Sequence, residues 1–285
     1  MKIGNYQVNL IDSGRFRLDG GAMFGVVPRV LWERKMPPDE AGRIQLGANL
    51  LLLRNADRLI LVDTGMGDKG DEKFLKINAV NHSQFNLASG LKNLDVAPED
   101  ITDVILTHLH YDHAGGATKV NADGEIVPTF PNAKYYVQRE HFGWAMKPTE
   151  KDRASFLKEN FIPLQEANCL ILVDGERELL PGLRLLPIDG HTTAQQMVLV
   201  RGEDRTLLFA GDLLPTSRHV SIPWIMAYDI APLKTLEEKK HYLHLATDQD
   251  WIVVFEHDPD VSAAAIQVTD KGFALGKSVD INEEL

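Results

Sequence analysis

The stretch "TDVILTHLHYDHAGG", residues 102–116, is the most informative segment for the fold. It begins as an apolar, strand-like run and continues directly into His108, His110, Asp112 and His113. A loop that leaves a strand can aim alternate side chains at one point, and imidazole and carboxylate are ligands that zinc prefers. A polar turn capping a helix after Asp112 would account for one of these residues and leave three histidines unexplained. The pattern therefore predicts a metal-binding loop at a strand end.

The overall composition excludes several classes of protein. Of the 285 residues, 44% are hydrophobic and 25% are charged, as in ordinary globular proteins. The formal net charge of -11 argues against nucleic acid and anionic membranes as partners, because both need clustered Lys and Arg. The single cysteine, Cys169, cannot form an internal disulfide, and no signal peptide or membrane-spanning apolar run is visible. We expect a cytoplasmic protein without nucleic-acid or membrane partners.

Short apolar runs bounded by Gly, Asp or Asn recur along the chain and predict strands. Helix-compatible stretches lie between some of them, around residues 85–94, 141–146, 151–160 and 233–245. In the last stretch, Thr235 and Glu238 have the spacing of a helix capping box. Strands come both in adjacent pairs and separated by helices, which favours an α/β (α+β) fold with mixed sheets and helices outside.

No linker rich in Pro, Gly or Ser divides the chain. We therefore expect a single domain over residues 1–285, with irregular insertions near residues 20–45 and 213–232.

Further ligand-type residues follow three later strand-like runs. His191 ends "LRLLPIDGH", Asp212 ends "TLLFAGD", and His257 lies at the end of "WIVVFEHD". Each alone is typical of a turn or cap, but a rigid sheet end is also where a functional group can be held. Together with the loop they make five histidines and two aspartates. That set is sufficient for two metal ions with a carboxylate between them.

These motifs give the chain a family resemblance. They are "VDTG" at 62–65, "THLHYDHAGG" at 107–116, "GHTTAQQ" at 190–196, "FAGDLLP" at 209–215 and "FEHD" at 255–258. In order and spacing they resemble the metallo-β-lactamase superfamily of hydrolases. The resemblance implies a four-layer αβ/βα sandwich of two mixed sheets with helices outside and the metals at one sheet edge.

The resemblance also implies a role for each ligand residue. One metal would be held by His108, His110 and His191, the other by Asp112, His113 and His257, with Asp212 bridging them. Asp63 matches an outer position that supports the ligand loop, in keeping with the need to orient ligating imidazoles by hydrogen bonds. We expect two divalent ions per chain, zinc first, with Mn, Fe or Co as alternatives. Asp112 and Asp212 are also the expected proton donors to the leaving group.

Within the superfamily the chain most resembles quorum-quenching N-acyl-homoserine lactonases of the Bacillus type, with methyl parathion hydrolases nearby. Two apolar, Gly- and Pro-containing stretches carry this likeness, "GGAMFGVVPRVLW" at 20–32 and "PWIMAYDIAPLKTLEEKK" at 223–240. We expect these stretches to be loops that line a substrate pocket; the alternatives are that they form part of the core or a homodimer interface. The candidate pocket residues are Met23, Phe24, Val26, Trp32, Trp224, Met226 and His219; for His219, solvent exposure is the alternative.

One position departs from the lactonase pattern. Those enzymes carry a tyrosine three residues after the bridging aspartate, where this chain has Pro215. Tyr228 and Tyr111 are the candidates to take over its catalytic role. The expected activity is opening of N-acyl-homoserine lactones by hydroxide generated at the metals. The alternatives are a phosphotriesterase or arylesterase that uses the same site and, third, a non-catalytic binding module.

Overall fold

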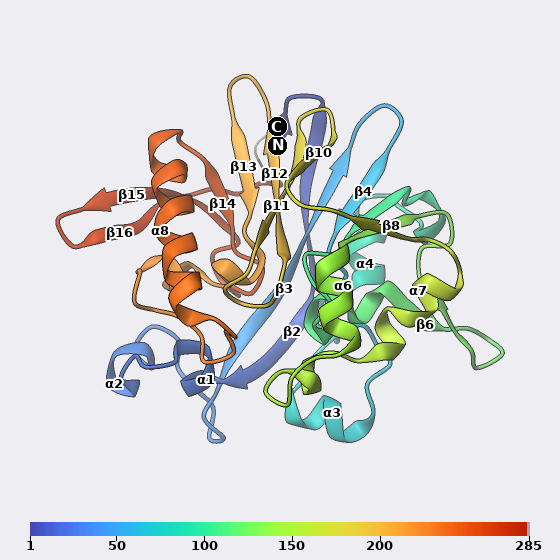
Figure 1. The fold of residues 1–285 in the computed structure, drawn as a ribbon, viewed down its shortest axis with the longest axis horizontal. Coiled ribbons are helices and arrows are strands. Elements are labelled where there is room, and N and C mark those ends of the chain that lie inside the picture. Colours follow the sequence, from blue (N-terminus) through green and yellow to red (C-terminus); the bar gives the residue numbers. More distant parts are fainter. Residues whose placement is uncertain (284–285) are drawn as a thin grey trace.

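Two large β-sheets form the centre of the protein. The computed structural model describes residues 1–283, and in it each of these sheets has seven strands. Figure 1 shows helix α8 (Pro232–Asp248) outside one sheet and helices α4 (Leu87–Lys92) and α6 (Arg139–Met146) outside the other. The expected four-layer sandwich with mixed sheets is confirmed.

The strands follow the chain from one sheet into the other. The first sheet contains β1 (Lys2–Ile3), β2 (Tyr6–Asp19), β3 (Arg43–Arg54), β4 (Leu59–Val62), β5 (Asp103–Ile105), β8 (Lys134–Gln138) and β9 (Leu170–Val173), in this order. The second contains β10 (Arg177–Leu180), β11 (Leu183–Ile188), β12 (Gln195–Arg201), β13 (Thr206–Phe209), β14 (Ile252–Val254), β15 (Ala263–Thr269) and β16 (Gly272–Ser278). A separate pair is formed by β6 (Thr118–Val120) and β7 (Ile126–Pro128).

The remaining helices are short. They are α1 (Gly20–Phe24), α2 (Arg29–Trp32), α3 (Glu72–Ile77), α5 (Tyr111–Ala114) and α7 (Ile162–Glu166). Single 3₁₀ turns are η1 (Pro98–Asp100), η2 (Gly115–Ala117), η3 (Arg153–Ser155), η4 (Lys158–Asn160), η5 (Gly211–Leu213) and η6 (Ser217–Val220). Among the described residues, no helix has the length and apolar character needed to cross a membrane.

Strand β3 shows why the sheets stack face to face. Successive side chains of a strand point to opposite faces. Leu50 and Leu52 accordingly pack toward the helices outside the first sheet, whereas Leu51 and Leu53 pack against residues of the second sheet. A strand buried on both faces must be apolar at every position, which explains the continuous run "LLLL".

The predicted ligands all follow the carboxyl ends of strands that run in the same direction within their sheet. Strands β4 and β5 pair in parallel, as do β13 and β14. Strand β11 is antiparallel to β12, which is antiparallel to β13, so β11 also points the same way. The residues after these strand ends therefore meet at one edge of the sandwich.

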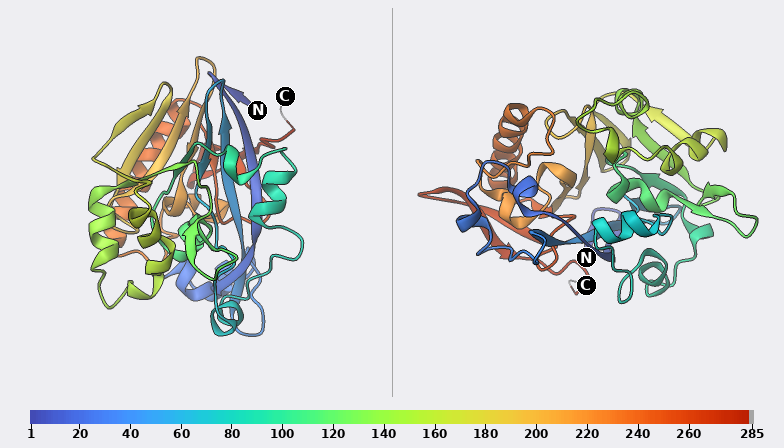
Figure 2. Two further views of the ribbon diagram at one scale, coloured as in Figure 1. Left: turned by 90° about the vertical axis from the view of Figure 1, so that its right-hand side faces the viewer. Right: turned by 90° about the horizontal axis from the view of Figure 1, so that it is seen from below.

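The amino terminus lies at the opposite end of the fold from the helices α1 and α2, as Figures 1 and 2 show. The amino group of Met1 donates a hydrogen bond to the carbonyl oxygen of Ile281 (2.8 Å), which joins the first strand to the last described residues.

Three local predictions were wrong. Residues 151–160 form the 3₁₀ turns η3 and η4 instead of a helix, and the insertion at 20–45 contains the helices α1 and α2. The capping box is absent because α8 begins one turn earlier, after Ala231, without a side-chain cap. Thr235 and Glu238 lie inside the helix and are buried, so their side chains bond to neighbouring segments.

Candidate metal centre

One group of imidazoles converges from two segments of the chain. The Nδ1 atom of His110 lies 3.0 Å from Nε2 of His108 and 3.1 Å from Nε2 of His191. All three side chains are buried. His108 and His110 leave β5 on the predicted loop, and His191 follows β11, so this group joins the two sheets.

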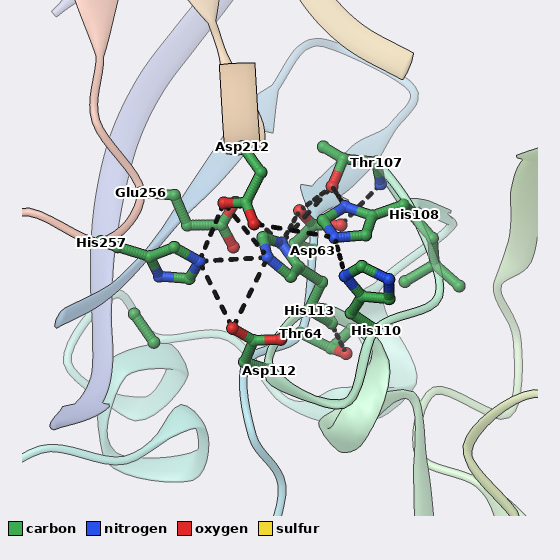
Figure 3. Close-up of polar contacts among 12 residues, drawn as sticks. Asp63, Thr64, Thr107, His108, His110, Asp112, His113, Asp212, Glu256 and His257 are labelled. Atoms are coloured by element: carbon green, nitrogen blue, oxygen red, sulfur yellow. Dashed lines mark hydrogen bonds and ion pairs between the residues drawn. The ribbon is translucent and has the colours of Figure 1, made fainter. Parts of the chain in front are cut away.

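A second group lies beside the first. The Nε2 atoms of His113 and His257 are 3.0 Å apart, and Oδ2 of Asp112 lies 3.9 Å from the former and 3.6 Å from the latter. His113 and Asp112 belong to the short helix α5, and His257 follows β14. Figure 3 shows the side chains of Asp112, His113 and His257 pointing toward one another, with dashed lines joining all three.

Asp212 stands between the two groups. Its Oδ2 atom is 3.1 Å from Nε2 of His191 and 4.0 Å from Nε2 of His108. Its Oδ1 atom is 3.2 Å from Nε2 of His257 and 3.6 Å from Nε2 of His113. Each carboxylate oxygen therefore faces a different group, which is the arrangement that a bridging carboxylate requires. The structure thus brings all seven predicted ligands together.

Asp63 connects three parts of the ligand loop. It accepts hydrogen bonds from the backbone N–H (2.7 Å) and hydroxyl (2.6 Å) of Thr107, and lies 3.1 Å from Nδ1 of His113. The Thr107 hydroxyl is also 3.0 Å from Nδ1 of His108. Asp63 adopts a left-handed backbone conformation (φ 58°), which is uncommon for a non-glycine residue and points to a functional constraint.

Other residues that orient the ligands escaped sequence analysis. Asp229 lies 2.9 Å from Nδ1 of His191, and the carbonyl oxygen of Gly47 lies 3.0 Å from Nδ1 of His257. Glu256 is fully buried, 3.1 Å from Nδ1 of His113. Only Glu256, the neighbour of a ligand in "FEHD", had a signal in the sequence.

His141 holds the ligand loop from α6 without being a ligand. Its Nε2 accepts a hydrogen bond from the backbone N–H of Leu109 (2.8 Å), so its Nδ1–H donates to the carbonyl oxygen of Thr193 (2.8 Å). Burial lowers the pKa of His141 to about 4, consistent with this neutral form. One side chain therefore ties the loop of His108 to the loop that follows His191.

Helix α8 fixes the loop that carries His191. Glu238 accepts hydrogen bonds from the backbone N–H groups of Asp189 (2.8 Å) and Gly190 (3.0 Å). Thr235 donates a hydrogen bond to Oδ2 of Asp229 (2.8 Å). The other carboxylate oxygen of Asp229, Oδ1, lies 2.9 Å from Nδ1 of His191. The two residues of the predicted capping box thus hold the His191 loop and Asp229 in place.

The donor atoms fit metal cations. His113 and His257 each have Nδ1 directed at an oxygen acceptor, Asp63 and the Gly47 carbonyl respectively, so their Nε2 atoms are free to present lone pairs. Two lone pairs 3.0 Å apart repel each other unless a cation lies beside both. Oδ1 of Asp212 is buried and has no hydrogen-bond partner among residues 1–283. A bound metal ion would give these lone pairs and this buried carboxylate oxygen the partner that they need.

The electrostatics agree with this fit. Burial, followed by the nearby imidazoles, lowers the pKa of His108 and His110 well below 6.5, which keeps them neutral as metal ligation requires. Burial also acts on His257, but the facing carboxylate of Asp212 outweighs it and raises the pKa to about 9, so a metal ion that binds Nε2 of His257 displaces a proton from it. The second group thus attracts positive charge, which a divalent cation supplies.

A small cavity of about 60 Å³ opens beside the ligands. Its apolar lining comes from Leu18, Met23 and Met226, and its polar lining includes Tyr111, Tyr228, Lys151, Asp152 and Ser155. Of the predicted pocket residues, Met23 and Met226 therefore lie at the cavity, together with the candidate catalytic residues Tyr111 and Tyr228.

The other predicted pocket residues lie elsewhere. Phe24 stacks on Trp32 (ring centroids 5.6 Å apart) and on His219 (5.1 Å), and its ring meets the edge of Trp224 at 5.3 Å. These four side chains form the packing behind the cavity and do not line it, because aromatic rings of this size gain more from mutual burial. Val26 points into solvent, with 91% of its surface exposed.

The two candidate tyrosines differ in their bonding. The hydroxyl of Tyr111 donates to Oδ1 of Asn78 (3.3 Å). Tyr228 lines the same cavity, and burial raises its pKa to about 12, so its phenol keeps its proton at neutral pH. Pro215 contributes its carbonyl oxygen, which accepts a hydrogen bond from the backbone N–H of His257 (2.8 Å).

Comparisons with known proteins place the chain among hydrolases. The family model described as the metallo-beta-lactamase superfamily matches residues 43–257. The N-acyl homoserine lactonase AiiB of Rhizobium rhizogenes is 26% identical over 281 residues, covering 92% of this chain and 96% of that protein.

Two solved structures are also similar. A probable metal-dependent hydrolase from Staphylococcus aureus has a TM-score of 0.86 at 27% identity, covering 98% of this chain and 100% of the other. The dizinc quorum-quenching lactonase AidC, solved with a product, has a TM-score of 0.79 at 20% identity, with coverages of 98% and 96%, and shows a shared fold. The resemblance drawn from the motifs is confirmed.

Proposed function

The chain belongs to the metallo-β-lactamase superfamily and is a metal-dependent hydrolase, and from this membership we propose that it opens N-acyl-homoserine lactones with two divalent metal ions. The observation that carries the two-metal proposal is the carboxylate of Asp212, whose two oxygens face two separate ligand groups. The lactone substrate is supported by the relative named for that activity, which aligns over nearly its whole length.

The cavity supports the same substrate class. Leu18, Met23 and Met226 offer an apolar surface for an acyl chain, and the phenol of Tyr228 offers a hydrogen-bond donor for a carbonyl group. Ligand sites generally combine an apolar lining with a few placed polar groups. We assign zinc as the metal, since five imidazoles are borderline-soft donors that suit it, with Mn, Fe and Co as alternatives.

When bound, a pair of such cations lowers the pKa of a shared water toward neutrality and polarises a carbonyl group. Ring opening adds water across the lactone bond: the carbonyl carbon gains a hydroxyl group and the ring oxygen gains a proton. Asp112 and Asp212 are the carboxylates at the site that can hold this proton at an Oδ atom and pass it to the departing oxygen. Tyr228 donates its hydroxyl hydrogen to the substrate carbonyl oxygen as negative charge develops there. The fully buried Asp63 and Asp229 keep the imidazoles in place.

The test is a substrate panel with metal-loaded protein: homoserine lactones of several acyl lengths, a paraoxon-like triester and aryl esters. We expect the highest kcat/KM for a lactone, loss of all turnover after chelation, and recovery when the metal is returned. A higher kcat/KM for the triester or aryl esters would replace the proposal with the phosphotriesterase or arylesterase alternative. Metal-loaded protein that hydrolyses none of these substrates would favour a binding module.

A further inference from the structure

The wall of the cavity on the side of the second sheet is an irregular segment. We call residues 221–229, which lie between η6 and α8, the wall segment. It carries Trp224, Met226 and Tyr228, and it contains neither helix nor strand. Buried backbone carbonyls outside regular structure need hydrogen-bond donors from elsewhere.

A buried lysine supplies donors to the first half of the wall segment. The Nζ atom of Lys239, in α8, donates to the carbonyl oxygens of Ser221 (2.9 Å), Ile222 (3.2 Å) and Trp224 (2.7 Å). Lys239 is fully buried. Releasing these carbonyls would leave an ammonium group buried without partners, so this end of the segment is fixed.

A second lysine serves the other half. The Nζ atom of Lys151 donates to the carbonyl oxygens of Ala227 (3.0 Å), Tyr228 (2.7 Å) and Asp229 (3.1 Å). Lys151 follows α6, which lies outside the first sheet, whereas the wall segment precedes α8, outside the second (Figure 1). Its three bonds therefore close the cavity by joining the two halves of the sandwich.

Unlike Lys239, Lys151 is exposed. Water can replace the three carbonyl oxygens around its ammonium group at small cost, because surface interactions of this kind contribute little free energy. The two lysines make similar contacts, so their difference in burial decides which end of the wall segment can open.

The cavity must widen to admit substrate. Its volume of about 60 Å³ is far below the roughly 300–1,000 Å³ of sites for small organic ligands. Opening at residues 227 and 228 would enlarge it. Asp229 limits the movement, because its side chain is held by His191 (2.9 Å) and Thr235 (2.8 Å). The wall can therefore move without releasing a metal ligand.

We propose that Lys151 is a specificity-determining positioning residue whose contacts with residues 227–229 set how large an acyl chain enters the cavity. This inference rests on the proposed function for the identity of the substrate. The contact itself can be tested without any substrate.

The first experiment is peptide-resolved hydrogen exchange on the metal-loaded protein. The reporters are the amides of Ala227, Asp229, Ile230 and Ala231, which donate to backbone carbonyls. Lys151→Met should speed exchange of the Ala227 and Asp229 amides about threefold, because local opening becomes easier. Lys151→Arg, which keeps a multiple donor, should recover part of the protection. Lys158→Met removes another exposed lysine, in η4, and should match wild type.

The second experiment measures kcat and KM for short- and long-chain lactones. Lys151→Met should shift the ratio of kcat/KM about threefold toward long chains, mainly through KM, with metal content unchanged. Exchange in Lys151→Met equal to wild type, or a kcat/KM change equal for all chain lengths, would overturn the inference. If wild type shows no lactone turnover, the proposed function fails while the exchange result still decides whether Lys151 holds the wall.

Discussion

The metal ligands and the wall segment are neighbours at one cavity, yet they are held in different ways. The ligands follow strand ends, and outer groups such as Asp63 and Asp229 fix their imidazole rings. The wall segment contains no strand, and the ammonium groups of Lys151 and Lys239 hold it by donating hydrogen bonds to its carbonyl oxygens. Residues at strand ends hold the ligand atoms in place, whereas one end of the wall segment is held by a single exposed lysine.

The largest effect is expected when the proposed bridging ligand is removed. Asp212→Ala should lower kcat/KM for the best substrate by about a thousandfold or more, since both metals lose a shared carboxylate. Asp123→Ala, at an exposed turn, is the matched control and should leave activity unchanged. Activity of Asp212→Ala within tenfold of wild type would refute the assigned role.

A second prediction concerns acid stability and His141. Its pKa is about 4 in the fold against 6.5 for a free histidine, so the unfolded chain binds this proton at higher pH. Stability should therefore fall as the pH drops from about 6.5 to about 4, by up to about 3 kcal/mol from this group. His141→Gln can still donate to Thr193 and accept from Leu109 without titrating, so this part of the loss should vanish in denaturant titrations at each pH. Equal slopes for both proteins would contradict the prediction.

The support of His191 comes next in size. Asp229→Ala should weaken metal binding and activity roughly 10- to 100-fold, as is typical when a hydrogen-bond partner of a ligating histidine is lost. Asp229→Asn keeps an oxygen acceptor for Nδ1 of His191 and should fall between wild type and alanine. Metal affinity can be measured by competition with a chromophoric chelator, and an unchanged affinity in Asp229→Ala would show that the ring needs no such support.

The smallest effect is expected at the wall. Tyr228→Phe should reduce kcat for a lactone about tenfold, the value of one well-placed hydrogen bond, with little change in metal content. Tyr111→Phe should change kcat less than about twofold, because the Tyr111 hydroxyl already donates to Asn78. A larger loss of kcat in Tyr111→Phe than in Tyr228→Phe would assign the contact with the substrate carbonyl to Tyr111.

The sequence predicted the metal centre better than the wall, for a physical reason. Ligands at strand ends combine a local apolar run with residue types that have few other uses, as in "TLLFAGD" before the bridging position. Strand β3 was likewise predictable from its short apolar run, and the structure adds that the strand is buried on both faces. These features depend on short stretches of chain.

The missed features depend on distant backbone. The carbonyl oxygen of Gly47 meets His257 across 210 positions, and no residue type signals such a contact. The helix expected over residues 151–160 is replaced by turns, since Asp152 accepts hydrogen bonds from Thr149 and Trp144 and side-chain bonds of this kind compete with a helix. Thr235 and Glu238 have the spacing of a capping box, but both side chains form hydrogen bonds with residues outside the helix instead. The local sequence pattern cannot show such tertiary partners.

If Asp212 joins two metals in one site, the number of metal ions bound per chain should depend on its carboxylate. Protein stripped by chelation, reloaded with zinc and freed of excess metal would be analysed for metal per chain. We expect two ions per chain in the wild-type protein and fewer than two in Asp212→Ala. A single ion in the wild-type protein, or two retained by Asp212→Ala, would contradict it.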